Sequence, residues 1–351
     1  MTGTPALTVV IVTWNGAHLL GDCLAGLARQ DLDAAAWEVL VVDNASIDGT
    51  AEWLAREHPQ VRVLGSATNR GFAGGAHLGL TAVTTPYAVL LNNDAVPEPG
   101  FLSALLAAAD APGGERVGAI TGKVVLAPRF RLLPPGSTAD EPAGDVVTPA
   151  GVARPDPDGT VDVLNSTGNV VTRSGYGRDR SWLEVDTGAE PPAEVFGFCG
   201  AAALLRMSAA EVVGDFDEDL FLYYEDTDLS WRLRTHGWTI RYEPAAVVRH
   251  QHAASSDVRS RLFRFHDDRN RLLVLAKNAP ARLAVAALLR YPLTVASLTV
   301  HQGPREAMTA TRVHALASCL WLLPRMLRRR RALGRGAVVS SRQTAALLTA
   351  D

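Results

Sequence analysis

Three short groups of polar residues follow apolar stretches of the chain, each at the point where a strand is expected to end. The groups are Thr13-Trp14-Asn15, Asp43-Asn44-Ala45-Ser46 with Asp48 just beyond, and Asn92-Asn93-Asp94. Ligands of open parallel sheets bind beyond the carboxyl ends of the strands. One such group alone would be ordinary turn or cap chemistry, which is our interpretation of Asp48. Three groups together favour a binding site.

The chemistry of these strand ends favours a divalent cation over a phosphate-binding loop. A dinucleotide site would need GxGxxG after the first strand, where the chain has Trp14-Asn15-Gly16-Ala17-His18. The segment 118–124 is one residue short of a P-loop and lacks its hydroxyl. A carboxylate such as Asp94 can instead hold a hard cation that bridges a diphosphate.

A second acidic region lies at 216–232, where carboxylates alternate with aromatic residues. Asp228 and Arg232 are four residues apart on an expected helix and should form a structural pair. Glu225 and Asp226 fall at the start of that helix, where a capping role is the simplest interpretation. The neighbouring aromatic residues favour a partly closed pocket, in which either carboxylate could serve as a general base.

Two histidines follow in the segment Arg249-His250-Gln251-His252. On a strand, His250 and His252 point to the same face. Each could be an ordinary polar residue. His250 is also a candidate metal ligand beside a sheet that already carries Asp94, and His252 is a secondary candidate.

The elements expected to position these residues are alternating strands and helices. Strands are predicted at 7–13, 39–42, 61–64, 87–91, 117–126, 238–242 and 246–249, and helices at 18–29, 48–57, 71–83, 101–109 and 225–235. This alternation predicts an α/β fold with a mostly parallel sheet and helices on both faces. Residues 127–160, rich in Pro and Gly, are predicted to be a mobile insertion without packed structure. A largely helical region is expected from residue 257, so the predicted domains are 1–256 and 257–351.

The composition permits a large core and gives no overall attraction to nucleic acid. Of 351 residues, 47% are hydrophobic, and the net charge is −3. Cys23, Cys199 and Cys319 are far apart, which suggests neither a zinc site nor a disulfide framework and favours a reducing cytoplasm. The apolar stretch 283–300 is interrupted by Arg290 and Pro292, so an interfacial helix is expected there.

In combination, five motifs resemble the inverting glycosyltransferases of family 2, which have a GT-A fold. The motifs are Val-Ile-Val-Thr-Trp-Asn at 10–15, Val-Val-Asp-Asn-Ala-Ser at 41–46, Asn-Arg-Gly-Phe-Ala-Gly-Gly at 69–75, Leu-Leu-Asn-Asn-Asp at 90–94 and Tyr-Tyr-Glu-Asp-Thr-Asp-Leu-Ser-Trp-Arg at 223–232. Within the family, the chain is most similar to bacterial rhamnosyltransferases that build cell-envelope glycans. The stretches 164–169 and 269–272 point the same way.

The resemblance implies a role for each matching residue. The residues implied to contact the donor nucleotide diphosphosugar are Thr13, Asn15, Asp43, Asn69, Arg70, Gly71, Asn92 and Asn93. Asp94 and His250 would hold Mn²⁺ or Mg²⁺, and Asp226 would be the catalytic base. The donor implied first is dTDP-L-rhamnose, followed by a UDP-sugar such as UDP-galactofuranose. The acceptor would be a hydroxyl of a glycan or of a polyprenyl-diphosphate-linked saccharide.

The chain departs from the family pattern at two positions. Asn92 replaces the first Asp of the family's Asp-x-Asp, so it could contact the sugar or ribose instead of a metal. His77 stands where many relatives carry Asn, which bears on the donor contacts. Asn92 also keeps open the alternative of a binding module that has lost turnover.

A basic cluster follows the apolar residues 315–323 near the end of the chain. It consists of Arg325, Arg328, Arg329, Arg330, Arg331 and Arg335. A solvated helix end is the simplest interpretation. We expect instead an interfacial segment on an anionic bilayer, which places the protein on the inner face of the plasma membrane. Nucleic acid is the alternative partner, but no motif that reads a groove or interleaves aromatics accompanies the arginines.

Overall fold

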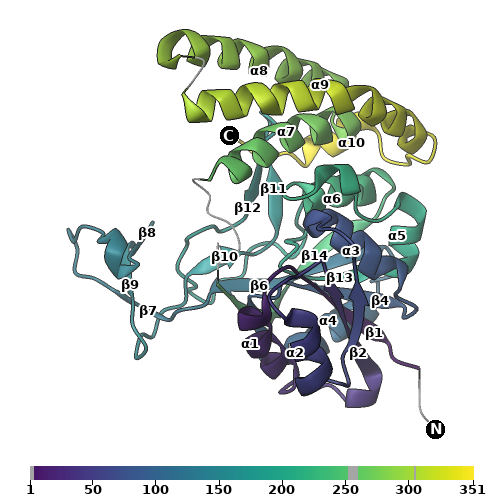
Figure 1. Ribbon diagram of the computed structural model, residues 1–351, viewed down its shortest axis with the longest axis vertical. Helices are drawn as coiled ribbons and strands as arrows, with labels where there is room; N and C mark the ends of the chain where they lie inside the picture. Colours follow the sequence, from purple (N-terminus) through teal and green to yellow (C-terminus); the bar gives the residue numbers. More distant parts are fainter. Residues whose placement is uncertain (1–3, 252–259, 304–305) are drawn as a thin grey trace.

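The computed structural model describes residues 4–251, 260–303 and 306–351 (Figure 1). The strands are β1 (Leu7–Thr13), β2 (Trp37–Asp43), β3 (Arg62–Gly65), β4 (Tyr87–Leu91), β5 (Ala95–Pro97), β6 (Val117–Leu126), β7 (Phe130–Leu132), β8 (Val146–Thr148), β9 (Gly151–Pro155), β10 (Leu164–Ser166), β11 (Asn169–Val171), β12 (Gly177–Asp179), β13 (Ala202–Arg206) and β14 (Thr239–His250). The α-helices are α1 (Ala17–Leu27), α2 (Thr50–Glu57), α3 (Gly71–Thr81), α4 (Phe101–Asp110), α5 (Met207–Val213), α6 (Glu225–Thr235), α7 (Arg261–Asn278), α8 (Ala281–Gln302), α9 (Ala307–Gly334) and α10 (Ser341–Ala346). Short 3₁₀ turns are η1 (Ala34–Ala36), η2 (Glu141–Ala143) and η3 (Glu218–Leu220).

The main sheet has the strand order β3-β2-β1-β4-β13-β6-β14-β5, with β10 paired to β6. The first four strands of this order are parallel, as predicted, and β14 is parallel to β6. The sheet is more mixed than predicted, because β13 runs antiparallel to both β4 and β6. The two strands predicted at 238–242 and 246–249 form one long strand, β14, with a register shift between Glu243 and Val247.

Alternate residues of the central strands bury against different layers of helices. In β1, Val9 and Ile11 belong to a core cluster that contains apolar residues of α1 and α4. Val10 belongs to a second cluster, with residues of α3, α5 and α6. This two-residue period is the signature of a strand buried on both faces. The α/β architecture with helices on both faces of the sheet is therefore confirmed.

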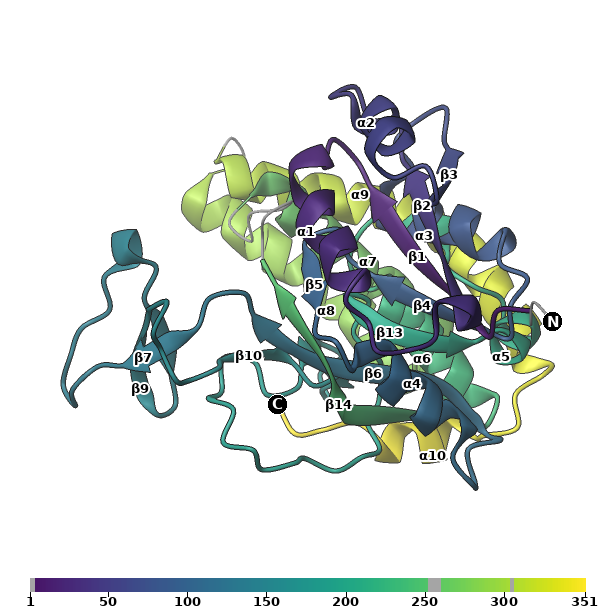
Figure 2. The ribbon, with the colours of Figure 1, turned by 90° about the horizontal axis from the view of Figure 1, so that it is seen from below.

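The insertion at 127–160 is not the unpacked loop that its composition predicted. Strands β7, β9 and β8 form a small antiparallel sheet, which extends away from the main body (Figures 1 and 2). Phe130 and Ala153 are buried in a cluster with Leu126 and Val163. Arg154 also binds both carboxylate oxygens of Asp145 at 2.8 Å. Strands of three to five residues between prolines leave too short a pattern for periodicity to detect.

The C-terminal helices α7, α8 and α9 pack on one another at one end of the molecule (Figure 1). The apolar residues of α7 share a core cluster with Trp231 of α6, which ties these helices to the first part of the chain. After α10, the chain returns to β11, where the amide of Thr349 donates to the carbonyl oxygen of Val171 at 2.9 Å. The predicted domain boundary at 256/257 falls outside the described residues.

The basic cluster near the C-terminus is partly used inside the protein. Arg325 binds Asp219 at 2.6 Å. Arg329 binds both Asp217 and Asp219 at 2.6 Å, and Arg330 donates to the carbonyl oxygen of Ala276 at 3.1 Å. These three arginines of the cluster that we expected at a bilayer surface therefore also bind groups of the protein itself. The acidic partners of Arg325 and Arg329 lie more than 100 residues earlier, where sequence spacing gives no indication of them.

Candidate active site

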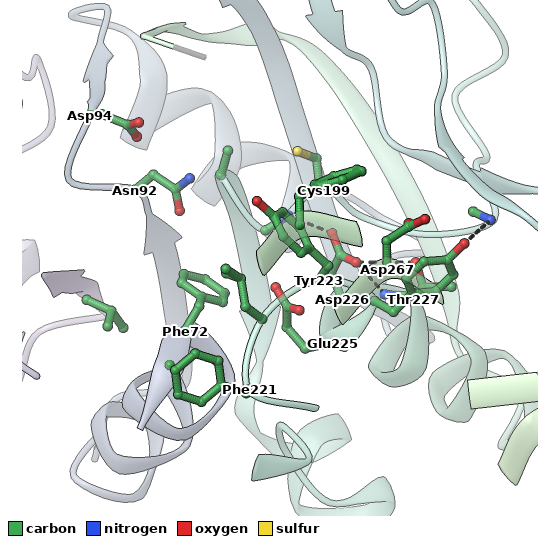
Figure 3. A pocket seen from close by; sticks show the side chains of 18 of the residues that line it. Phe72, Asn92, Asp94, Cys199, Phe221, Tyr223, Glu225, Asp226, Thr227 and Asp267 are labelled. Atoms are coloured by element: carbon green, nitrogen blue, oxygen red, sulfur yellow. Dashed lines mark hydrogen bonds between the residues drawn. The ribbon is translucent and has the colours of Figure 1, made fainter. Parts of the chain in front are cut away.

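A pocket of about 580 Å³ opens at the carboxyl ends of β1, β2 and β4. It is closed on the other side by residues 221–227 and by the N-terminal half of α7. The predicted site residues that line it are Thr13, Asn69, Gly71, Asn92, Asn93, Asp94, Glu225, Asp226 and His250. In the view of Figure 3, Asn92 and Asp94 lie on one side of the pocket and Asp226 and Asp267 on the other. The sequence thus located most of the residues that meet in one cavity.

Asn15, Asp43 and Arg70 do not line this pocket. The side-chain oxygen of Asn15 accepts a hydrogen bond from the Ile47 amide at 2.8 Å. Asp43 accepts one from the Ser46 amide at 3.0 Å. These two side chains stabilise the turns after β1 and β2, which is the turn chemistry that Asn and Asp commonly perform. The guanidinium of Arg70 pairs with Glu218.

Asn44, which sequence reasoning did not select, organises the side of the pocket formed by the strand ends. Its Oδ1 accepts from the Arg70 amide at 3.0 Å, and its Nδ2 donates to the carbonyl oxygen of Gly71 at 2.9 Å. Nδ2 also donates to Oδ1 of Asn69 at 3.1 Å. A Cβ at Gly71 would lie 2.2 Å from the carbonyl oxygen of Phe221, and its φ is +68°, so glycine is required there. Asn44 stands in the conspicuous motif at 41–46, which is the signal that could have identified it.

Two buried polar side chains join the ends of neighbouring strands. Nδ2 of Asn93, after β4, donates to Oγ1 of Thr13, at the end of β1, at a distance of 3.0 Å. A Cβ at Gly16 would lie 2.5 Å or less from both side chains, so the backbone approaches them closely here. Thr13 and Asn93 therefore fix the floor of the pocket. His77 faces away from it, with Nδ1 2.6 Å from Oδ1 of Asp215.

Asp94 and His250 meet although they are far apart in the sequence. The pairing of β5 with β14 sets His250 opposite Ala95. Nε2 of His250 then lies 3.1 Å from Oδ1 of Asp94 and 3.3 Å from Nδ2 of Asn92. Its other ring nitrogen, Nδ1, lies 2.7 Å from Oδ1 of Asn165. His252 lies outside the described residues.

The donor set at this point fits a divalent cation. Oδ1 of Asp94 is buried and has no hydrogen-bond partner among the described residues. When Nδ1 of His250 donates to Oδ1 of Asn165, Nε2 can present a lone pair to a cation beside Asp94. Two anionic or electron-rich atoms that face each other favour a cation between them. Within the described residues, no three His, Cys, Asp or Glu side chains are grouped as metal ligands.

Asp226 is held on the opposite side of the pocket by hydrogen bonds from three residues. Its Oδ2 accepts from Nδ2 of Asn169 at 2.7 Å and from the Gly200 amide at 3.2 Å. Its Oδ1 accepts from the Thr227 amide at 2.6 Å. Burial raises the pKa of Asp226, while these hydrogen bonds oppose that rise. The arrangement suits a carboxylate that remains ionised yet is basic enough to accept a proton.

Glu225 and Asp179 are two further carboxyl groups that line the pocket. Burial raises the pKa of Glu225 well above its ordinary value, and the neighbouring charge of Asp226 adds to the effect. Oε2 of Glu225 has no hydrogen-bond partner among the described residues. Burial also raises the pKa of Asp179 to about 6, and Asp226 again contributes. A pair of carboxyl groups with separated pKa values is how a site keeps one group neutral and the other ionised. Sequence reasoning missed Asp179.

The comparisons with known proteins agree with this geometry. Residues 8–127 match the family described as glycosyl transferase family 2. The chain is 30% identical over 280 residues to the N-acetylglucosaminyl-diphospho-decaprenol L-rhamnosyltransferase of Mycobacterium tuberculosis. The match covers 75% of this chain and 82% of that protein. It is 29% identical over 247 residues to the pre-mycofactocin glycosyltransferase of the same organism, and this match covers 70% of this chain and 43% of that protein.

Two solved structures share the fold at low sequence identity. The mannosyltransferase PcManGT of Pyrobaculum calidifontis, in complex with GDP-Man and Mn²⁺, has a TM-score of 0.51 and 19% identity, and the match covers 91% of this chain and 88% of that chain. GalNAc-T7 with UDP, GalNAc and Mn²⁺ has a TM-score of 0.58 and 12% identity, and the match covers 89% of this chain and 55% of that chain. The predicted GT-A fold is confirmed. The polar strand ends, the carboxylate opposite them and the similarity to the rhamnosyltransferase lead to one conclusion: this chain is a glycosyltransferase and belongs to family 2.

Proposed function

We propose that the chain transfers L-rhamnose from dTDP-L-rhamnose to a hydroxyl of a polyprenyl-diphosphate-linked saccharide, with inversion at the anomeric carbon. The observation that carries this proposal is the position of Asp226. Its carboxylate lies in the pocket opposite the polar strand ends and is held there by hydrogen bonds from three residues. The name of the mycobacterial relative supports the choice of sugar and acceptor.

In the proposed reaction, the donor lies along the ends of β1, β2 and β4. Asn44 and Asn69 hold the turn before α3 in place through hydrogen bonds to the carbonyl oxygen and the amide of Gly71. Asp226 accepts the proton of the acceptor hydroxyl. The hydroxyl oxygen attacks the anomeric carbon from the face opposite the diphosphate, and the bond from that carbon to the diphosphate oxygen breaks. One displacement inverts the configuration of the anomeric carbon.

Asp94 and His250 are the residues that would hold a divalent cation, with Asn165 fixing the ring of His250. When bound, Mn²⁺ or Mg²⁺ would offset the negative charge of the departing nucleoside diphosphate. The amide of Asn92 already contacts His250, so this residue has a role beside the metal that a neutral side chain can fill. Mn²⁺ in both solved neighbours supports the assignment.

The exposed faces of α8 and α9 support attachment to the surface of a bilayer. Among the described helices, α8 alone has the length and apolar composition that a membrane crossing requires. Its window of apolar residues is only 22% buried, and Leu293 is 71% exposed. Trp321 of α9 is 76% exposed. The two helices contain eight arginines and no acidic residue. An apolar face flanked by arginines is typical of an interfacial segment, so the proposed location is the cytoplasmic membrane surface.

The test is a thermal-shift panel followed by a transfer assay. Purified protein is mixed with dTDP, UDP, GDP and their common sugars, with and without Mn²⁺, because a ligand that binds the folded state raises the melting temperature. Metal-dependent stabilisation by dTDP, and transfer from dTDP-L-rhamnose to a lipid-linked saccharide, would support the proposal. Preference for UDP would point to another sugar, such as galactofuranose. Binding without transfer would support a module that has lost turnover.

A further inference from the structure

The backbone just before Asp226 adopts conformations that residues other than glycine rarely adopt. Phe221 has φ +65° and ψ −61°, and the Leu222 amide bonds the carbonyl oxygen of Leu220 at 2.7 Å. This is a γ-turn of the rare, strained kind. Tyr223 and Tyr224 follow, each with φ +68°, in the left-handed region. Such conformations persist only where the surroundings hold them in place.

One buried side chain from α7 bonds the carbonyl groups of this loop. Asn270 is 0% exposed, and its Nδ2 lies 2.8 Å from the carbonyl oxygens of Leu220, Leu222 and Tyr223. The preceding residue, Arg269, donates from Nη2 to the carbonyl oxygen of Leu220 at 2.8 Å and to that of Asp219 at 3.0 Å. Arg269 also donates from Nε to Oδ1 of Asn270 at 2.8 Å, which fixes the amide with Nδ2 toward the loop.

The loop held by Asn270 connects the two halves of the site. At its beginning, the carbonyl oxygen of Phe221 accepts from the Ala73 amide at 3.0 Å, in the first turn of α3 on the donor side. At its end, Tyr224 is the N-cap of α6, so the loop determines where the first turn of that helix begins. Asp226 lies in that first turn. A displacement of the loop would therefore move the carboxylate relative to the donor.

We propose that Asn270 is a positioning residue for the reaction, acting through the backbone of residues 220–224 on the placement of Asp226. The inference rests on the proposed role of Asp226 as the base. Asn270 does not line the pocket, and so it has no direct contact with substrate to lose. Asn270 bonds carbonyl groups of the strained turn next to the proposed base.

The test compares Asn270→Ala with Val274→Ala in the full-length protein. Val274 is buried on α7 one turn after Asn270, so its truncation loosens the same helix without removing a bond to the loop. For Asn270→Ala we expect kcat to fall about 100-fold, the loss typical of a misplaced catalytic group. The KM for the donor should stay near that of the wild type, since Asn44 and Asn69 remain in place. Val274→Ala should keep a near-normal kcat below its melting temperature.

Thermal shift with dTDP and Mn²⁺ measures the folded, donor-binding fraction of each variant, so kcat can be expressed per competent molecule. If Asn270→Ala does not fold, the kcat of Asn270→Ser, which keeps one O–H donor, is compared with that of Val274→Ala instead. The inference is overturned if either variant retains a kcat close to that of Val274→Ala, or if its loss lies entirely in the donor KM. Asp226→Asn is measured beside them. Full turnover in Asp226→Asn would refute the proposed role of Asp226 as the base, whereas an inactive Asp226→Asn with a normal Asn270→Ala would refute only this inference.

Discussion

The amide oxygen of Asn165 lies 2.7 Å from Nδ1 of His250, on the side of the ring opposite Asp94. Asn165 therefore orients a proposed metal ligand without touching the metal. We expect Asn165→Ala to weaken Mn²⁺ binding by about 10- to 100-fold, the usual effect of removing such an outer partner. A titration of Mn²⁺ in the presence of dTDP, followed by thermal shift, measures this directly. Unchanged Mn²⁺ affinity would show that His250 does not bind the metal through Nε2.

Asp226→Asn should reduce kcat by about 10²- to 10⁴-fold, because the amide cannot accept the proton of the acceptor hydroxyl. Donor binding should change little, since the side chain is nearly the same size and the strand ends are untouched. Steady-state kinetics with saturating acceptor, together with dTDP binding by thermal shift, separates the two quantities. A kcat close to that of the wild type would remove Asp226 from the role of base.

The dependence of turnover on pH should reflect the raised pKa of Asp226. A base must be ionised to act, so kcat falls as the pH drops through that pKa, and the acid limb should lie above the ordinary aspartate value of about 4. Asp179 and Glu225 are the carboxyl groups that line the pocket with it. Asp226→Asn removes a negative charge beside Asp179 and should lower the pKa of Asp179 from about 6. An unchanged pKa of Asp179, measured by NMR titration, would mean that the two carboxyl groups titrate independently.

Lys277 is expected to be critical for stability. Its side chain is 5% exposed, and its ammonium nitrogen lies 2.7 Å from Asp217 and 2.9 Å from Asp228. Lys277→Met leaves two buried carboxylates with fewer partners, and we expect a loss of about 3 kcal/mol in the free energy of unfolding at pH 7. Urea unfolding of the wild type and the variant measures this loss. A loss below about 1 kcal/mol, the range of exposed ion pairs, would contradict the expectation.

Acid should reduce the difference in stability between the wild type and Lys277→Met. Burial opposes ionisation of Asp228, but Lys277 and Arg232 lower its pKa to about 2. The folded-state pKa is below the unfolded value of about 4, so this carboxylate stabilises the fold fully above pH 4. Its contribution is lost as the pH falls from about 4 to about 2. The difference in the free energy of unfolding between wild type and Lys277→Met, measured with urea, should therefore become smaller as the pH falls from about 4 to about 2.

Membrane attachment can be tested on the exposed face of α8. Leu289 and Leu293 are both exposed, and replacing both by Ser should reduce binding to vesicles containing phosphatidylglycerol by at least about tenfold, since each leucine would otherwise bury in the interface. Val212→Ser, at an exposed apolar residue of α5, is the matched control. Flotation of vesicles with bound protein provides the measurement. Equal flotation of the three proteins would exclude this face as the contact surface.

The sequence predicted the bounds of an element best where a single hydrophobic period extends over the whole element. The bounds predicted for β1, β4, β6 and α6 match the structure, because apolar runs and helical spacing are local properties. Asn15 and Asp43 were predicted as donor contacts, but their side chains stabilise their own turns. A polar residue after a strand has the same local signature whether it binds a ligand or closes a turn.

The missed residues of the site depend on pairing between distant segments. Asn165 reaches His250 because β10 pairs with β6. Asn169, in β11, reaches Asp226. Asp179 lies opposite Asn169 through the pairing of β12 with β11. These strands have three residues each, too few for periodicity to show their direction or partner. Position along the chain therefore could not reveal which amides face the carboxylates.

The ion pairs of Arg325 and Arg329 with Asp217 and Asp219 have a consequence for how this protein can change over evolution. They join α9 to the turn that leads into residues 220–224, so the C-terminal helices are not an interchangeable module. A chimaera that takes α9 from another family member would leave the two aspartates without their arginines unless residues 217–219 came with it. Substitutions in these two segments are therefore expected to be inherited together, although about 100 residues separate them.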